Sequence, residues 1–140
     1  MITMTVGQLL EAKDALVRMM KLQLPLKQAY QLTKIAKVAD VELELFEKAR
    51  NARLEQYGEQ THTDENTGRK DYKILPENAS KFRHEMRDLL AAEIELQVRP
   101  FDLMTLPEAV TVSAADLTSL GSLVTYTEPE GQTTEGAAIP

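Results

Sequence analysis

The chain has 140 residues and a net charge of −6, with 43% hydrophobic residues but only 5% aromatic ones. It contains no Trp and no Cys, which excludes disulfides, thiolate metal sites and cysteine nucleophiles. The length suits one domain, and an aliphatic core of this kind is typical of helix bundles rather than of sandwiches or barrels.

The first predicted helix covers residues 5–22. It opens with a capping box, in which Thr5 caps the helix and Gln8 occupies the third helical position. Apolar residues then recur at helical spacing, which predicts one buried face. These residues are Leu9, Ala12, Leu16 and Met19.

A much longer helix is predicted at residues 25–57. Pro25 suits a first helical turn, no Gly or Pro interrupts the segment, and Gly58 takes the C′ position after it. At 1.5 Å per residue the helix is about 50 Å long, so we expect its apolar stripe to exceed what one short chain can cover. The stripe comprises Leu32, Ile35, Val38, Ala39, Val41, Leu45, Phe46, Ala49 and Ala52.

Charge is unevenly distributed along this long helix. Residues 1–37 hold six basic and two acidic residues, whereas residues 38–59 hold six acidic and three basic ones. The three lysines Lys27, Lys34 and Lys37 could form a modest, salt-sensitive contact with nucleic acid phosphates. The alternative, which we favour, is that they are ordinary solubilising side chains.

The segment at residues 60–74 is predicted to form a small β-hairpin or loop around the turn sequence 64–68. The turn resembles a fragment of a calcium-binding EF-hand loop. However, the Gly and Glu that the loop requires at positions 6 and 12 are replaced by Arg69 and Leu75. A tight turn therefore accounts for these residues.

A third helix is predicted at residues 76–97, opened by Pro76 and ending before Pro100. Residues 99–112 should be irregular, apart from a short strand at Ala109–Val112. A short helix at 113–123 opens on a second capping box, Ser113 to Asp116.

The predicted fold is therefore mainly α. It consists of an antiparallel helical hairpin with a very long second helix, a third helix, a small β-hairpin insertion and an extended C-terminal tail. Residues 1–124 form the helical domain. Residues 125–140 form the tail, whose acidic, weakly apolar composition predicts disorder when it is free.

Residue constellations that support catalysis are not evident. His84, Glu85 and Asp88 lie near one helical face, but this H-E-x-x-D pattern lacks the second His of a zinc protease. The carboxylate pairs lie in open, mixed-charge stretches without the contrasting environments that catalysis needs. We expect no enzymatic activity, no metal and no cofactor. The N-terminus lacks a signal-peptide pattern, and no apolar run is long enough for a membrane span.

The stretch between the long helix and the third helix contains a distinctive order of short motifs. They are Phe46-Glu47-Lys48-Ala49-Arg50, Gln56-Tyr57-Gly58-Glu59, Asp64-Glu65-Asn66-Thr67-Gly68, Tyr72-Lys73-Ile74, Pro76-Glu77-Asn78, Phe82, Glu85-Met86, Leu89-Leu90, Glu93 and Glu95. This order resembles a group of small uncharacterised proteins of tailed bacteriophages, over about residues 5–98. The resemblance implies a phage origin, a location in the virion or host cytoplasm, and a non-enzymatic role without catalytic residues.

The leading hypothesis is a small phage structural or assembly protein that acts through contacts with other phage proteins or with copies of itself, as an oligomer or part of an assembly. The alternative is a phage-encoded inhibitor or modulator of a host enzyme, such as one that acts on nucleic acid. A weaker third hypothesis is direct nucleic acid binding. The residues predicted to contact protein are Ile35, Val38, Val41, Leu45, Phe46, Tyr126, Glu128 and Glu130.

Overall fold

The computed structural model describes residues 1–63, 65–68 and 70–126. The helices in these ranges are α1 (Val6–Met20), α2 (Leu26–Tyr57), α3 (Ala79–Ala91) and α4 (Ala114–Leu120). The strands are β1 (Ile2–Thr5), β2 (Gly58–Thr63), β3 (Lys70–Ile74), β4 (Glu93–Leu96), β5 (Phe101–Asp102) and β6 (Val124–Thr125). Short 3₁₀ turns lie at Pro76–Asn78, Leu103–Thr105 and Gly121–Leu123.

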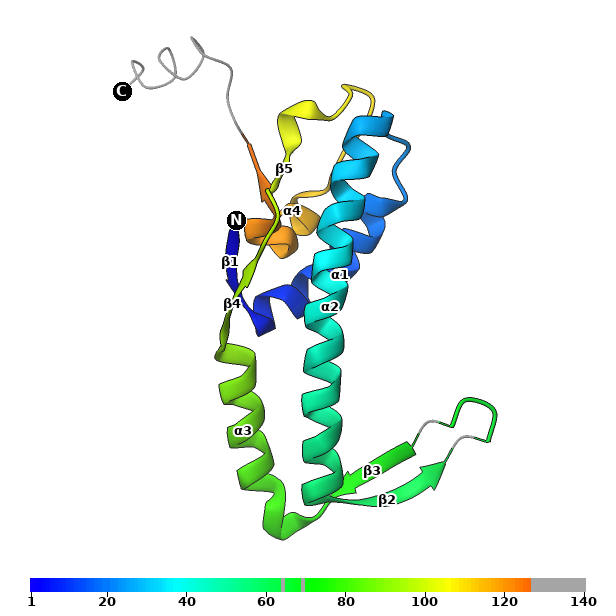
Figure 1. Cartoon of the computed structure of the whole chain (residues 1–140), viewed down its shortest axis with the longest axis vertical. Helices are drawn as coiled ribbons and strands as arrows, with labels where there is room; N and C mark the ends of the chain where they lie inside the picture. The colour runs from blue at the N-terminus through cyan, green and yellow to red at the C-terminus, as the bar shows by residue number, and fades with distance from the viewer. Residues whose placement is uncertain (64, 69, 127–140) are drawn as a thin grey trace.

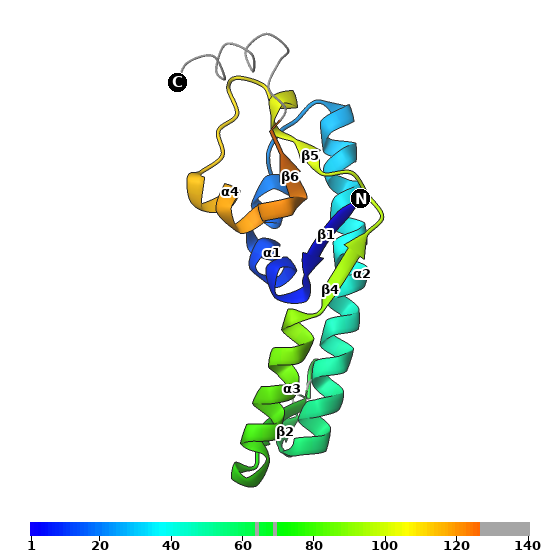
Figure 2. The ribbon, with the colours of Figure 1, turned by 90° about the vertical axis from the view of Figure 1, so that its left-hand side faces the viewer.

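The mainly α architecture is confirmed, with a very long second helix, a third helix and small strand pairs. Figure 1 shows that α2 runs through two parts of the molecule. We call residues 1–43 and 92–126 the body, and residues 44–91 the stalk. In the stalk, α3 lies alongside the C-terminal part of α2 (Figures 1 and 2), and the β2–β3 hairpin projects from the far end (Figure 1).

The core lies in the body, where α1 contacts both α2 and α4. One face of α1 is buried, and the small side chains of Ala12 and Ala15 allow its neighbours to approach closely. Nearly all of the fully buried apolar side chains belong to this cluster. They include Ile2, Leu9, Met19, Leu32, Ile35, Ala39, Leu96, Phe101, Leu120 and Leu123.

The N-terminal strand β1 pairs with β4 in antiparallel register, with Ile2 opposite Leu96 and Thr5 opposite Glu93. The prediction of one helix across 76–97 is therefore wrong at both ends. Residues 76–78 form a 3₁₀ turn, the α-helix ends at Ala91, and β4 follows. The reason is tertiary: β1 supplies a strand partner, and the alternation of exposed and covered side chains in β4 suits a sheet that faces the core.

The helix starts predicted from capping residues, at Thr5 and Ser113, are both present, but the reciprocal box forms at Thr5, whereas the Asp116 carboxylate accepts hydrogen bonds from Arg18. Thr5 and Gln8 form a reciprocal capping box, in which each side chain accepts a hydrogen bond from the other residue's backbone N–H. The Ser113 hydroxyl accepts a hydrogen bond from the Asp116 backbone N–H at 3.1 Å. The strand predicted at Ala109–Val112 does not form, because the Val110 N–H donates to the Pro107 carbonyl in a turn.

The end of α2 differs from the predicted C′ glycine. Gly58 has φ −117° and ψ 173°, which is extended backbone rather than the left-handed conformation of a C′ residue. The helix passes directly into β2. A Cβ at this position would lie 2.6 Å from the Leu54 carbonyl oxygen and 3.0 Å from that of Lys73. Glycine is required here because two backbone segments approach closely.

The predicted hairpin at 60–74 is confirmed as the antiparallel pair of β2 and β3, with a bulge between Gln60 and His62. It contacts α2, and the Leu75 N–H donates to the Tyr57 carbonyl at 3.2 Å. The stalk has little interior. Phe46 is buried, but α3 has no fully buried residue, because α2 packs along one side of it and α1 contacts it without enclosing it.

Candidate functional site

The long-helix stripe divides into an inward and an outward half. Ile35 is 0% exposed and Phe46 is 8% exposed, so both side chains are already covered by the chain itself. Val38 is half-buried against the core. The proposal that Ile35 and Phe46 contact a partner is corrected accordingly. The body and α3 cover this half of the stripe. The body includes the β1–β4 pair, which the sequence patterns did not reveal.

The opposite face of α2 exposes large apolar side chains to solvent. Leu26 is 85% exposed, Tyr30 61%, Val41 58% and Leu45 54%. Their spacing of four, eleven and four residues places them on one side of a helix with 3.6 residues per turn. We call the surface formed by Leu26, Tyr30, Lys34, Lys37, Val41, Glu44, Leu45 and Lys48 the outer face of α2.

Charged groups on the outer face lie among these apolar side chains. The Lys34 ammonium lies 4.8 Å from the centroid of the Tyr30 ring, which is within cation–π distance. Lys48 forms an i,i+4 ion pair with Glu44 at 3.6 Å. This mixture of aliphatic, aromatic and charged groups is suited to contact with another protein.

The three lysines proposed to contact nucleic acid are all exposed on α2. Lys34 and Lys37 belong to the outer face, and Lys27 lies two turns before Lys34 on the same side of the helix. The structure therefore brings them onto one surface. That surface also carries Leu26 and Val41, which a phosphate backbone does not require.

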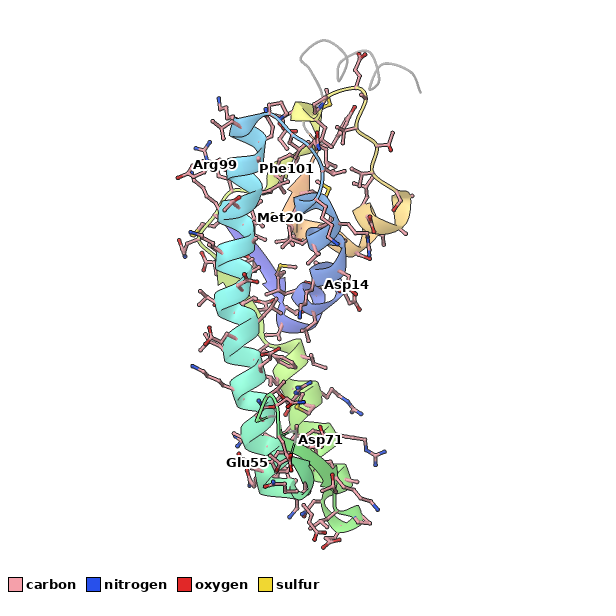
Figure 3. All side chains as sticks on the ribbon, turned by 90° about the vertical axis from the view of Figure 1, so that its right-hand side faces the viewer. Asp14, Met20, Glu55, Asp71, Arg99 and Phe101 are labelled. Carbon is pink, nitrogen blue, oxygen red and sulfur yellow. The ribbon has the colours of Figure 1, made fainter. Side chains whose placement is uncertain are left out.

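A cleft of about 880 Å³ lies between the C-terminal part of α2 and the hairpin. The Tyr72 hydroxyl donates a hydrogen bond to Glu55 at 3.2 Å, and burial together with the Glu55 charge raises the pKa of Tyr72. Figure 3 shows Glu55 and Asp71 together at this end of the stalk. The lining mixes both charge signs: Glu47, Arg50, Asn51, Leu54, Glu55, Gly68, Asp71 and Tyr72.

The sequence patterns did not reveal this cleft. Its two walls are separated along the chain, and they meet because the close backbone approach at Gly58 holds the base of the hairpin against the end of α2. The only local signal is Gly58 itself. A glycine directly after a long helix indicates helix termination at least as readily as close packing, so the residue alone does not predict a cleft.

Two shallower depressions border α3. One, of about 260 Å³, lies between α2 and α3 and includes Met86 and Leu89, with Arg53 and Glu85 paired at 3.5 Å. The other, of about 250 Å³, is lined by Ser80, Arg83, His84 and Arg87. Neither depression is enclosed by more than one or two elements, so both are surface features of the stalk.

The H-E-x-x-D segment lies on α3, where His84 and Asp88 approach to 3.5 Å on the exposed helix surface. Within the described ranges, no group of three or more His, Asp or Glu side chains is placed to hold a metal ion. Among the described helices, none is long and apolar enough to cross a membrane.

Only part of the predicted tail contact can be located. Tyr126 is exposed at the end of the described chain. Glu128 and Glu130 lie outside the described residues.

Comparison with known proteins returns no significant match to a family model, a curated protein or a solved structure.

Proposed function

We propose that this chain is a small structural or assembly protein of a tailed bacteriophage, acting through protein–protein contacts in a virion or its precursor. The observation that carries the proposal is the outer face of α2. It exposes Leu26, Tyr30, Val41 and Leu45 along one helix. Soluble monomers scatter single apolar residues over their surface, whereas aligned ones mark an interaction site.

The energetics support a contact of moderate strength. Complete burial of a side chain such as Leu or Val contributes about 1.5–3 kcal/mol. Since Val41 and Leu45 are each roughly half exposed already, covering either one would contribute about 1 kcal/mol. Several such contributions favour association, but they do not require a permanent complex.

The shape of the chain also supports a role in assembly. The stalk carries the hairpin away from the body (Figure 1), so one small chain offers two separated surfaces. The phage origin is supported by the resemblance of about residues 5–98 to small proteins of tailed bacteriophages. The outer face and the stalk do not depend on that resemblance.

The test is mass spectrometry of purified particles from the phage whose genome encodes the chain. We expect the wild-type protein in the particles and the Leu45→Glu variant to be depleted from them. Val17→Glu is the matched control, because Val17 is an exposed apolar residue on α1. Absence of the wild-type protein from particles, together with early expression, would reject the proposal and favour a modulator of a host enzyme.

A further inference from the structure

The outer face of α2 is polarised as well as apolar. Along this helix, Lys27, Lys34 and Lys37 precede residue 38, and four acidic residues follow between positions 40 and 47. On the outer face, Lys37 and Glu44 lie two turns apart on opposite sides of Val41. Within the described ranges, Lys37 forms no ion pair. Glu44 has only the long contact to Lys48.

We infer that the outer face of α2 binds a second copy of this chain, with the two α2 helices antiparallel and a two-fold axis near residues 40–41. In this arrangement Lys37 of each copy faces Glu44 of the other, and Val41 and Leu45 of both copies lie at the centre. The inference rests on the proposed function, that of a protein acting through protein contacts, and it names the partner.

The charge pattern favours a second copy over an unrelated partner because the surface is complementary to itself. A two-fold contact uses the same patch twice, so a basic end must meet an acidic end. Antiparallel alignment satisfies this requirement and forms two Lys37–Glu44 pairs. Parallel alignment would place Lys37 against Lys37 and Glu44 against Glu44, which is repulsive.

The position of the outer face allows this approach. Ile35 and Ala39, which are 0% exposed, point toward the body core. The outer face lies on the other side of the same helix, so the body does not come between the two copies. The hairpin meets α2 at Asn51 and Glu55, so it borders the positions that lie opposite Tyr30 and Leu26 of the other copy. With the axis near residues 40–41, residues 36–45 of the two copies overlap over about 14 Å, and Leu26 and Tyr30 lie opposite positions 55 and 51 of the other copy's α2. An overlap of this length makes a small interface, so we expect dimers whose population rises with protein concentration.

The first experiment is a charge-reversal cycle, read by sedimentation velocity over a range of concentrations. Lys37→Glu and Glu44→Lys each replace two attractive contacts with two repulsive ones. We therefore expect each variant to weaken the dimer about tenfold. The double variant restores both pairs in reverse and should return to near the wild-type affinity. Circular dichroism establishes that each variant retains its helices.

The inference is overturned if the wild-type chain stays monomeric at every concentration, or if the double variant is no better than the single ones. These outcomes are separable from failure of the proposed function. A monomeric chain that is nevertheless found in particles rejects the self-association alone. A dimeric chain that is absent from particles rejects the assembly role alone.

Orientation is tested by cysteine cross-linking, because the chain contains no Cys and any introduced thiol is unique. Val41→Cys, near the two-fold axis, should form a disulfide-linked dimer. Tyr30→Cys should not, because its two copies would lie about 30 Å apart along the paired helices. Equal cross-linking of both variants would instead indicate parallel helices and would refute the antiparallel arrangement.

Discussion

Replacing Gly58 with alanine should loosen the β2–β3 hairpin from the end of α2. The added Cβ would lie 2.6 Å from the Leu54 carbonyl oxygen and 3.0 Å from that of Lys73. Both are backbone atoms, so the helix end or the hairpin must shift, at a cost of about 1–3 kcal/mol. Alanine also restricts the unfolded chain, which stabilises by about 0.4–1 kcal/mol. The net expected loss is about 1 kcal/mol.

Amide hydrogen exchange of β2 and β3, combined with urea unfolding, measures this loss locally and globally. Gly68 provides the contrast, because it has φ +71° and a Cβ added there would meet open space. Asparagine tolerates that left-handed backbone, so Gly68→Asn should cost less than Gly68→Ala. Gly58→Asn should cost at least as much as Gly58→Ala. Unchanged or stronger protection of the hairpin in Gly58→Ala would refute the steric explanation.

Three further predictions concern the body. The Arg18 hydrogen bond lowers the pKa of Asp116 below its ordinary value of 3.8, so the folded chain protonates less readily than the unfolded one. The stabilising contribution of the Arg18–Asp116 pair is complete above pH 3.8 and is lost as the pH falls further. In Asp116→Asn, the free energy of unfolding by urea should therefore fall less between about pH 7 and about pH 3 than it does in the wild-type chain. Thr5→Ala removes the helix cap and should cost about 1 kcal/mol by urea unfolding. Ile35→Ala should cost about 2–5 kcal/mol.

Each of these predictions has a matched control or a contradicting outcome. Val41→Ala truncates an exposed residue on the same helix, so at protein concentrations where the chain is monomeric it should change stability by less than about 0.5 kcal/mol. A similar loss of stability in Val41→Ala and Ile35→Ala would contradict the division of α2 into two faces. An unaltered acid profile in Asp116→Asn would show that the ion pair does not contribute, and a neutral Thr5→Ala would show the same for the cap.

Features encoded in short sequence segments are predicted well. The capping box at Thr5, the uninterrupted α2, the Ser113 cap and the 60–74 hairpin are all present. Each depends on residues within a few positions of one another, so local chemistry determines the outcome.

Features that depend on residues far apart in the sequence are not predicted well. Residues 93–96 resemble the last turn of a helix because nothing local distinguishes them from one, and only pairing with β1 makes them a strand. The same limit applies to the candidate site. The apolar stripe of α2 is visible in the sequence, but the pattern does not separate buried Ile35 from exposed Val41. That separation depends on where α1, β1 and α3 lie, and the cleft beside Gly58 depends on the hairpin's direction.

The continuity of α2 fixes a distance within the molecule. Its 32 residues contain no Gly or Pro and span about 48 Å, so the hairpin is held at a set separation from the N-terminal end of α2. The helix thereby fixes the spacing between its N-terminal end in the body and the hairpin at the end of the stalk. Inserting two residues in its stalk portion would turn the hairpin by about 200° relative to the body, whereas inserting seven would nearly preserve its direction while moving it about 10 Å outward.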